Sequence, residues 1–179
     1  MSEIIESDVI SGVYITHLRS FGDDRGSFRE TFRKDWFPQR SWEIFQTNCS
    51  HSMKGVLRGL HYHFNQVDYW YVPRGRVRAA LFDMRPDSPT YMATQTVDMG
   101  EENDIGLFIP IGVAHGFATL EDATLMYIVD NYYDGDDEFG VAWNDPALGI
   151  DWGLADPVVS GRDQQNRPYN EIPDEERPK

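Results

Sequence analysis

Short runs of apolar residues with polar residues interspersed recur along most of this chain. They are rich in β-branched and aromatic residues, and clusters of glycine, proline and aspartate separate them. Short strands at regular spacing with turn signals between them are typical of a sandwich or barrel, so we predict an all-β fold. The expected strands cover residues 13–16, 28–32, 42–46, 56–63, 68–72, 76–83, 91–97, 105–109 and 125–131. Residues 34–40 are the one clear helical candidate, and Pro38 interrupts it.

The length of 179 residues suits one domain with a substantial core. We expect that domain to span residues 1–170, because no repeat or low-complexity linker divides the chain. Residues 171–179 are polar and punctuated by proline, and we predict that this tail is disordered.

The formal net charge of −14 disfavours a broad basic face for nucleic acid or an anionic membrane. An anionic small substrate would need a local basic pocket. The N-terminal residues lack the basic and apolar regions of a signal peptide, and no run approaches about 18 apolar residues. With a single cysteine in addition, we expect a cytoplasmic protein that binds no membrane and no nucleic acid.

Histidines mark the candidate chemistry. The stretch from Gly55 to His63 reads as a strand, and the spacing of His61 and His63 puts both imidazoles on one face. His115 follows a turn-rich segment further along the chain. Imidazole titrates near neutral pH and also binds metals, so these residues indicate either a proton-transfer base or a metal site.

Strand parity predicts several neighbours. If residues 64–67 form a hairpin loop, His63 lies opposite Asp68. Arg58 has the wrong parity to share a face with His61 on a regular strand, but a bulge at Gly59 would re-aim it. Tyr127 and Tyr133 share one parity and can face the same cavity.

Eight motifs in order resemble the dTDP-4-dehydrorhamnose 3,5-epimerase family, an RmlC-like branch of the cupins. They lie at residues 23–30, 46–50, 55–61, 83–90, 114–117, 143–146, 150–152 and 160–163. The resemblance implies a double-stranded β-helix, the cupin or jelly-roll architecture, with short peripheral helices. It also implies a homodimer in which N-terminal strands are exchanged or added across the interface.

The resemblance further implies a cofactor-free epimerase that inverts C3, C5 or both carbons of a nucleoside-diphosphate 4-keto-6-deoxyhexose, in deoxysugar biosynthesis. A base removes the proton beside the ketone, and an acid returns one on the opposite face. The implied catalytic residues are His61 as base, Asp163 as its orienting carboxylate and Tyr127 as acid. The implied substrate-binding residues are Arg58 and His115 at the sugar and Arg25, Glu30, Asn48 and Tyr133 at the nucleotide, with Arg25 reaching across the dimer.

These residue types suit the chemistry. A carbon acid beside a ketone is weaker than imidazolium by roughly ten or more pKa units, so His61 cannot remove the proton unaided. The enolate oxygen needs fixed positive charge in a water-poor pocket, and Arg58 is permanently charged. Tyrosine is a weak acid, suited to protonating an enolate.

Two positions depart from the family pattern. Asp68 stands where the family usually carries a lysine, and His63 stands where it usually has a residue other than histidine. The spacing of Gly55, His61, His63, Asp68 and Gly75 instead fits the metal-binding cupin motif, with aspartate in place of glutamate. Three imidazoles and one carboxylate suit zinc, iron, nickel or manganese.

Three hypotheses therefore remain open from the sequence. The leading one is the metal-free epimerase, in which His63 and Asp68 form a cross-strand pair. The second is a metal-dependent cupin enzyme that uses His61, His63, Asp68 and His115. The third is a non-catalytic protein that binds a sugar nucleotide on an epimerase scaffold.

Overall fold

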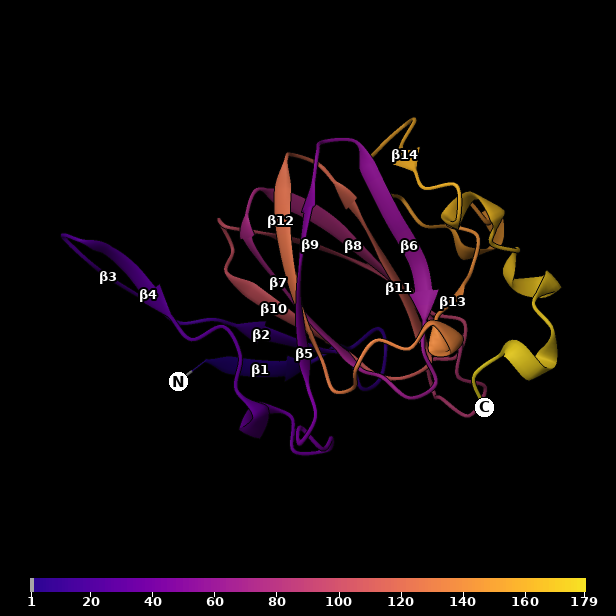
Figure 1. Cartoon of the computed structure of the whole chain (residues 1–179), viewed down its shortest axis with the longest axis horizontal. Helices are drawn as coiled ribbons and strands as arrows, with labels where there is room; N and C mark the ends of the chain where they lie inside the picture. Colours follow the sequence, from indigo (N-terminus) through magenta and orange to yellow (C-terminus); the bar gives the residue numbers. More distant parts are fainter. Residues whose placement is uncertain (1) are drawn as a thin grey trace.

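Two β-sheets face each other in the computed structural model, which describes residues 2–179, and a hairpin projects from them (Figure 1). The first sheet has the order β1 (Glu3–Glu6), β2 (Tyr14–His17), β10 (Ile105–Ile109), β7 (Asp68–Arg74), β12 (Ala123–Val129) and β5 (Gln46–Ser52). The second has the order β13 (Phe139–Gly140), β6 (Val56–Tyr62), β11 (Val113–Thr119), β8 (Arg76–Asp83) and β9 (Thr94–Gly100), with β14 (Val158–Val159) paired to β6.

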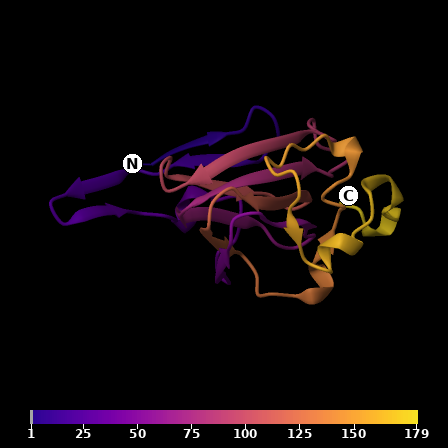
Figure 2. The same cartoon turned by 90° about the horizontal axis from the view of Figure 1, so that it is seen from above.

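The remaining elements lie around these sheets. The projecting hairpin consists of β3 (Ser20–Asp23) and β4 (Gly26–Arg29), and it extends from one end of the molecule in both views (Figures 1 and 2). Helical structure in residues 2–179 is limited to single 3-10 turns: η1 (Lys34–Trp36), η2 (Gly135–Asp137), η3 (Pro146–Leu148), η4 (Asp163–Gln165), η5 (Tyr169–Glu171) and η6 (Asp174–Glu176). The prediction of an all-β fold with short peripheral helices is confirmed. None of these helices is long and apolar enough to cross a membrane.

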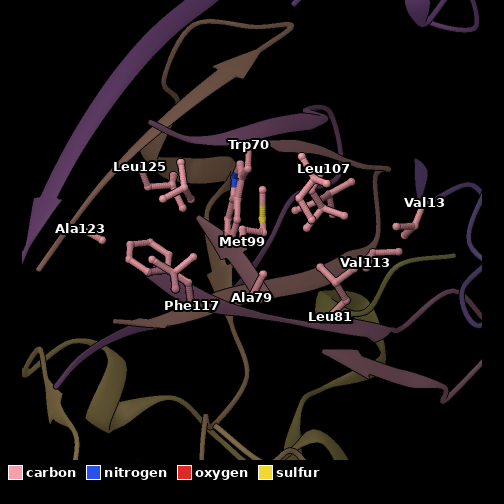
Figure 3. Packing of buried hydrophobic residues seen from close by; sticks show 14 of the residues in the cluster. Val13, Trp70, Ala79, Leu81, Met99, Leu107, Val113, Phe117, Ala123 and Leu125 are labelled. Carbon is pink, nitrogen blue, oxygen red and sulfur yellow. The ribbon is translucent and has the colours of Figure 1, made fainter. Parts of the chain in front are cut away.

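The main core fills the space between the two sheets. Figure 3 shows residues of the first sheet packed against residues of the second, namely Trp70, Leu107 and Leu125 against Ala79, Leu81 and Phe117. On β10, the side chains of Ile105, Leu107 and Ile109 join this core. Phe108 points to the opposite face of the sheet, where the segment containing Phe37 covers it. Both faces of β10 are therefore buried, which explains its continuous apolar run.

Strand prediction succeeded for β8 and β10, each of which lies directly beside a turn cluster. The strands β8 and β10 have the predicted bounds. β11 was not predicted, because Ala114, Gly116 and Ala118 have weak strand preference, yet it pairs with both β6 and β8. The predicted strand at residues 42–46 is wrong, since β5 begins only at Gln46.

The segment between β4 and β5 differs from the prediction because tertiary packing controls it. The helix expected at residues 34–40 is reduced to the single turn η1. Phe37 and Trp42 are buried against Tyr69 on the outer face of the first sheet. Trp42 donates its indole N–H to the carbonyl of Phe37 at 3.0 Å, which holds the chain in a compact loop.

The predicted hairpin between β6 and β7 is also wrong, because these strands belong to different sheets. Carboxylates hold the connecting loop as it crosses from one sheet to the other. Asp137 accepts the backbone N–H groups of Phe64 and Asn65, and Asp130 accepts that of Val67. These contacts replace the ladder hydrogen bonds that a hairpin would form.

The C-terminal tail is ordered in the structure, in contrast to the predicted disorder. Ile172 is buried in a second core cluster with Leu148 and Trp152. Tyr62 donates its hydroxyl to the carbonyl of Glu176 at 2.7 Å. The polar composition misled the prediction, because the buried Ile172 and the bonded carbonyl of Glu176 attach this segment to the rest of the fold.

Candidate active site

A cavity of about 410 Å³ opens between the two sheets and contains most of the candidate residues. The polar side chains that line it are Gln46, Asn48, Ser50, Arg58, His61, His63, Gln66, Asp68, His115, Tyr127, Tyr133, Glu138, Ser160, Arg162 and Asp163. Apolar walls come from Trp70, Phe117, Leu125 and Val129. A concave, partly apolar pocket with convergent polar groups is the usual form of a small-molecule site.

His61 and Asp163 form a hydrogen-bonded pair in this cavity. The Nε2 atom of His61 lies 2.7 Å from Oδ1 of Asp163. Burial raises the pKa of Asp163, but its hydrogen bond to His61, the charge of that ring and donors from Gly59 and Ser160 outweigh burial and hold the pKa below 3.8. Because the ionised carboxylate can only accept, Nε2 carries the proton and Nδ1 keeps its lone pair. His61 is therefore arranged as a base that acts through Nδ1.

The carboxylate of Asp163 is itself fixed by its local structure. Asp163 begins the turn η4, and its backbone N–H donates to the hydroxyl of Ser160 at 3.0 Å. Its second oxygen, Oδ2, accepts the backbone N–H of Gly59 at 3.2 Å. The side chain is 4% exposed. Such support limits the orientations available to the carboxylate and hence to the imidazole of His61.

Gly59 makes the irregularity that brings Arg58 into the site. The pairing of β6 with β11 shifts register between the partner pairs His115–His61 and Phe117–Arg58, as a bulge requires. Gly59 has a φ of +122°, and a Cβ atom there would lie 2.5 Å from Cα of Gly116. The predicted bulge at Gly59 is confirmed. Arg58 and His61 consequently line the same cavity, with Arg58 Nε donating to Ser52 Oγ at 3.0 Å.

Tyr127 lies in a row of three residues on the first sheet. It is the register partner of Asn48 on β5 and of Trp70 on β7. Directly paired residues share a sheet face, so all three present their side chains to the cavity. Burial, followed by the nearby carboxylates of Asp68 and Glu138, raises the pKa of Tyr127 above 10. The phenol is therefore protonated at neutral pH, in the form that can donate a proton.

His115 is the register partner of His61 on the neighbouring strand and is almost fully buried. Its Nδ1 donates to the carbonyl of Val113 at 2.9 Å. Burial lowers the pKa of His115 to about 4, although the charge of Asp68 acts in the opposite direction. The ring is thus neutral at pH 7.

The four residues predicted as an alternative metal set do not form one cluster. His63, Asp68 and His115 each place one ligand atom within 4.8 Å of the other two. His61 is not part of this group and instead binds Asp163. His63 and Asp68 do meet, but across the two sheets rather than within the predicted hairpin, with Nε2 and Oδ2 3.9 Å apart.

Glu138 and Arg162 line the cavity and were missed by the sequence analysis. Glu138 Oε1 lies 2.8 Å from Nη1 of Arg162 and 3.9 Å from Nδ1 of His61. Glu138 ends an acidic run that resembles a solvated loop, so no local signal separated it from its neighbours. Arg162 directly precedes Asp163 in one of the eight motifs, and that position was the available clue.

The predicted nucleotide-binding residues are only partly assembled in one chain. Asn48 and Tyr133 line the cavity, and Tyr133 is 68% exposed at its rim. Arg25 lies in the turn of the projecting hairpin, 89% exposed and paired with Asp23. Glu30 lies just after the hairpin, near Arg33. Neither Arg25 nor Glu30 lines the cavity of its own chain.

Comparisons with known proteins agree with this geometry. A family model described as dTDP-4-dehydrorhamnose 3,5-epimerase matches residues 7–171. The chain is 38% identical over 161 residues to the dTDP-4-dehydrorhamnose 3,5-epimerase of Shigella flexneri, covering 86% of this chain and 89% of that protein.

Two solved structures are similar over nearly the whole chain. The epimerase RmlC from Legionella pneumophila, in complex with dTDP-4-keto-L-rhamnose, superposes with a TM-score of 0.93 at 34% identity, covering 100% of this chain and 98% of that one. ChmJ, a 3'-monoepimerase from Streptomyces bikiniensis in complex with dTDP-quinovose, superposes with a TM-score of 0.85 at 30% identity. The match covers 92% of this chain and 87% of that one. The predicted cupin-type architecture is thereby confirmed.

Proposed function

Because this chain belongs to the dTDP-4-dehydrorhamnose 3,5-epimerase family, we propose that it epimerises a dTDP-linked 4-keto-6-deoxyhexose in deoxysugar biosynthesis. The observation that carries the proposal is the His61–Asp163 pair inside a cavity that Tyr127 also lines. A base and an acid on the walls of one pocket are the two groups that inversion at carbon requires.

The reaction begins with removal of a proton from the carbon beside the ketone. Nδ1 of His61 accepts this proton, and Asp163 stabilises the imidazolium that forms. The electron pair left on carbon delocalises onto the ketone oxygen and gives an enolate. Arg58, which lines the cavity, supplies a permanent positive charge toward that oxygen.

The second half of the reaction returns a proton to the opposite face of the same carbon. Tyr127 lies on β12 in the first sheet, whereas His61 lies on β6 in the second. Groups on opposite sheets can approach opposite faces of a sugar held between them. The phenol loses its proton to the carbon, and the enolate collapses to the ketone with inverted configuration.

We further propose that the protein acts as a homodimer whose hairpin completes the neighbouring nucleotide site. Arg25 and Glu30 do not reach the cavity of their own chain, and the hairpin exposes Phe21 and Phe28 on paired strand positions. Exposed aromatic side chains on a projecting hairpin favour a partner surface. Sedimentation at micromolar concentration tests the proposed dimer. We expect the wild type to be dimeric and Phe28→Asp to be monomeric. A monomeric wild type would contradict the proposal.

Incubation with dTDP-4-keto-6-deoxyglucose in heavy water tests the proposed reaction. Deuterium is expected at C3, at C5 or at both, and the labelled positions identify the carbons that are inverted. The His61→Asn variant should incorporate deuterium at least about 100-fold more slowly. His51→Asn, a change at an exposed histidine outside the cavity, should behave as wild type. Absence of deuterium at both carbons in the wild type would reject the proposal and favour a binding protein without turnover.

A further inference from the structure

Three potential ligand atoms converge in the cavity beside the His61–Asp163 pair. His63 follows β6, Asp68 begins β7 and His115 lies on β11, so three separate segments contribute one residue each. The distances from Asp68 Oδ2 to the Nε2 atoms of His63 and His115 are 3.9 and 3.8 Å. Both exceed hydrogen-bonding distance, so no direct hydrogen bond explains the cluster.

Backbone carbonyls determine which nitrogen of each ring carries the proton. Nδ1 of His63 lies 2.8 Å from the carbonyl of Asp137, and Nδ1 of His115 lies 2.9 Å from that of Val113. A carbonyl oxygen can only accept, so each Nδ1 is protonated and each neutral ring keeps its lone pair on Nε2. Histidines that bind metals are typically held in this way by a carbonyl at the other nitrogen.

The carboxylate of Asp68 is oriented by two further donors. Its Oδ1 accepts the indole N–H of Trp70 at 3.2 Å, and its Oδ2 accepts the side-chain amide of Gln66 at 3.1 Å. The side chains of Asp68 and His63 are only 4% and 12% exposed. Three lone-pair-bearing atoms thus face one another in a largely buried site, each supported by outer hydrogen bonds.

The formal charges that line the cavity favour a bound cation. Its lining contains two arginines, Arg58 and Arg162, and three carboxylates, Asp68, Glu138 and Asp163. Counted over these arginines and carboxylates alone, the formal charge is 2 − 3 = −1. An anionic sugar nucleotide and its enolate would be repelled by such a site. A divalent cation would change this balance to +1.

We propose that the Nε2 atoms of His63 and His115 and a carboxylate oxygen of Asp68 bind a divalent transition-metal ion. Two imidazoles and one carboxylate suit zinc, iron, manganese or cobalt, and three protein ligands leave coordination positions open to a substrate oxygen. Ligands about 2.1 Å from a tetrahedral metal lie roughly 3.4 Å apart. Small side-chain shifts would bring the observed atoms, all within 4.8 Å of one another, to that spacing.

The location suggests a role that rests on the proposed function. A metal bound beside His61 would polarise the ketone and stabilise the enolate as a Lewis acid. His61 is not part of the cluster of ligand atoms, and its Nε2 is engaged with Asp163. The proton-transfer pair and the metal site therefore coexist in one cavity without sharing a residue.

Titration of the metal-stripped full-length protein with Co²⁺, followed by absorption, tests the site in the absence of substrate. We expect one tightly bound Co²⁺ per chain with ligand-field bands typical of a nitrogen and oxygen donor set. His63→Gln and Asp68→Asn should each weaken binding by more than about 100-fold. His61→Asn and the exposed control His51→Gln should retain it. The proposal would be overturned if the wild type did not bind Co²⁺ stoichiometrically. It would also be overturned if both ligand variants bound Co²⁺ as tightly as the wild type.

Two further measurements distinguish metal binding from the epimerase reaction. Zn²⁺ should raise the Tm of the wild type and of His61→Asn, but not that of Asp68→Asn, since a ligand stabilises only a fold that binds it. Deuterium exchange into the substrate is then compared between stripped and loaded wild type. A Tm shift without any exchange would contradict the epimerase function while supporting the metal site. Equal exchange in both forms would overturn the Lewis-acid role.

Discussion

His61 and Asp163 lie 2.7 Å apart between Nε2 and Oδ1, although 102 residues separate them in the chain. The contact joins the end of β6 to the turn η4, and the same carboxylate also accepts the backbone N–H of Gly59. One side chain therefore orients the proposed base and supports the bulge that places Arg58 in the cavity. Catalytic geometry and local fold are coupled at Asp163.

Removal of either member of this pair should slow proton abstraction strongly. In His61→Asn the base is lost, and in Asp163→Asn the imidazolium loses its stabilising charge and the ring loses its preferred tautomer. We expect deuterium exchange into the substrate to fall about 10²–10⁴-fold in each variant. Nuclear magnetic resonance of the substrate in heavy water measures this, and exchange at the wild-type rate in His61→Asn would exclude that residue as the base.

Tyr127→Phe should separate the two halves of the reaction. The base remains, so exchange at the first carbon should continue, while inversion slows because no acid delivers a proton to the opposite face. The ratio of inverted product to deuterium incorporated should therefore fall well below the wild-type ratio. Tyr132→Phe, at a tyrosine that does not line the cavity, is the matched control. If exchange and inversion decline together in Tyr127→Phe, its assignment as the acid is incorrect.

Gly59→Ala should destabilise the protein strongly. The φ of +122° disfavours any residue with a Cβ, and that atom would lie 2.5 Å from the backbone of Gly116. We expect a loss of at least about 2 kcal/mol, or roughly 4–8 °C in Tm. Gly22→Ala, where the nearest atom to a Cβ is at 3.7 Å, should change Tm little. Calorimetry compares the two, and equal small shifts would contradict the proposed constraint at Gly59.

Asp83 should contribute stability that is lost in acid. Burial raises the pKa of this carboxyl, but hydrogen bonds from Arg85, Ser88 and Thr90 outweigh burial and hold the pKa below 3.8. A depressed folded-state pKa means that the unfolded chain binds a proton first as the pH falls. The stabilisation is therefore complete above the unfolded pKa of about 3.9 and disappears as the pH falls through the folded value.

Urea unfolding of wild type and Asp83→Asn at several pH values tests this directly. Because the amide cannot titrate, the difference in free energy of unfolding between the two proteins should be largest at neutral pH. It should shrink below about pH 4, where this carboxyl becomes protonated in the unfolded wild-type chain. A difference that stays constant down to pH 2.5 would show that Asp83 is not held by these donors.

Local pattern was enough to predict much of the scaffold and the chemical identity of the site. Runs beside turn clusters marked β8 and β10 correctly, and parity indicated that a bulge at Gly59 would bring Arg58 to the face of His61. The paired histidines at positions 61 and 63 were visible from spacing alone. These features depend on the sequence within a few residues, so single-sequence reasoning reaches them.

Long-range packing decided the features that the sequence analysis missed. The loop at residues 64–67 crosses between sheets because Asp130 and Asp137, more than sixty positions away, bind its N–H groups. Glu138, which directly follows Asp137 in the chain, lines the cavity. No local period encodes such contacts, since they exist only after distant strands have paired.

The amino-acid sequence by itself determined an all-β protein, its family and the residue types available for acid, base and ligand chemistry. Only the tertiary structure decided how the three histidines divide their roles. Asp163 binds His61, whereas the carbonyls of Val113 and Asp137 orient the rings of His115 and His63 toward Asp68. The physical reason is that an imidazole's function depends on which atom meets each of its two nitrogens, and those partners come from distant parts of the chain.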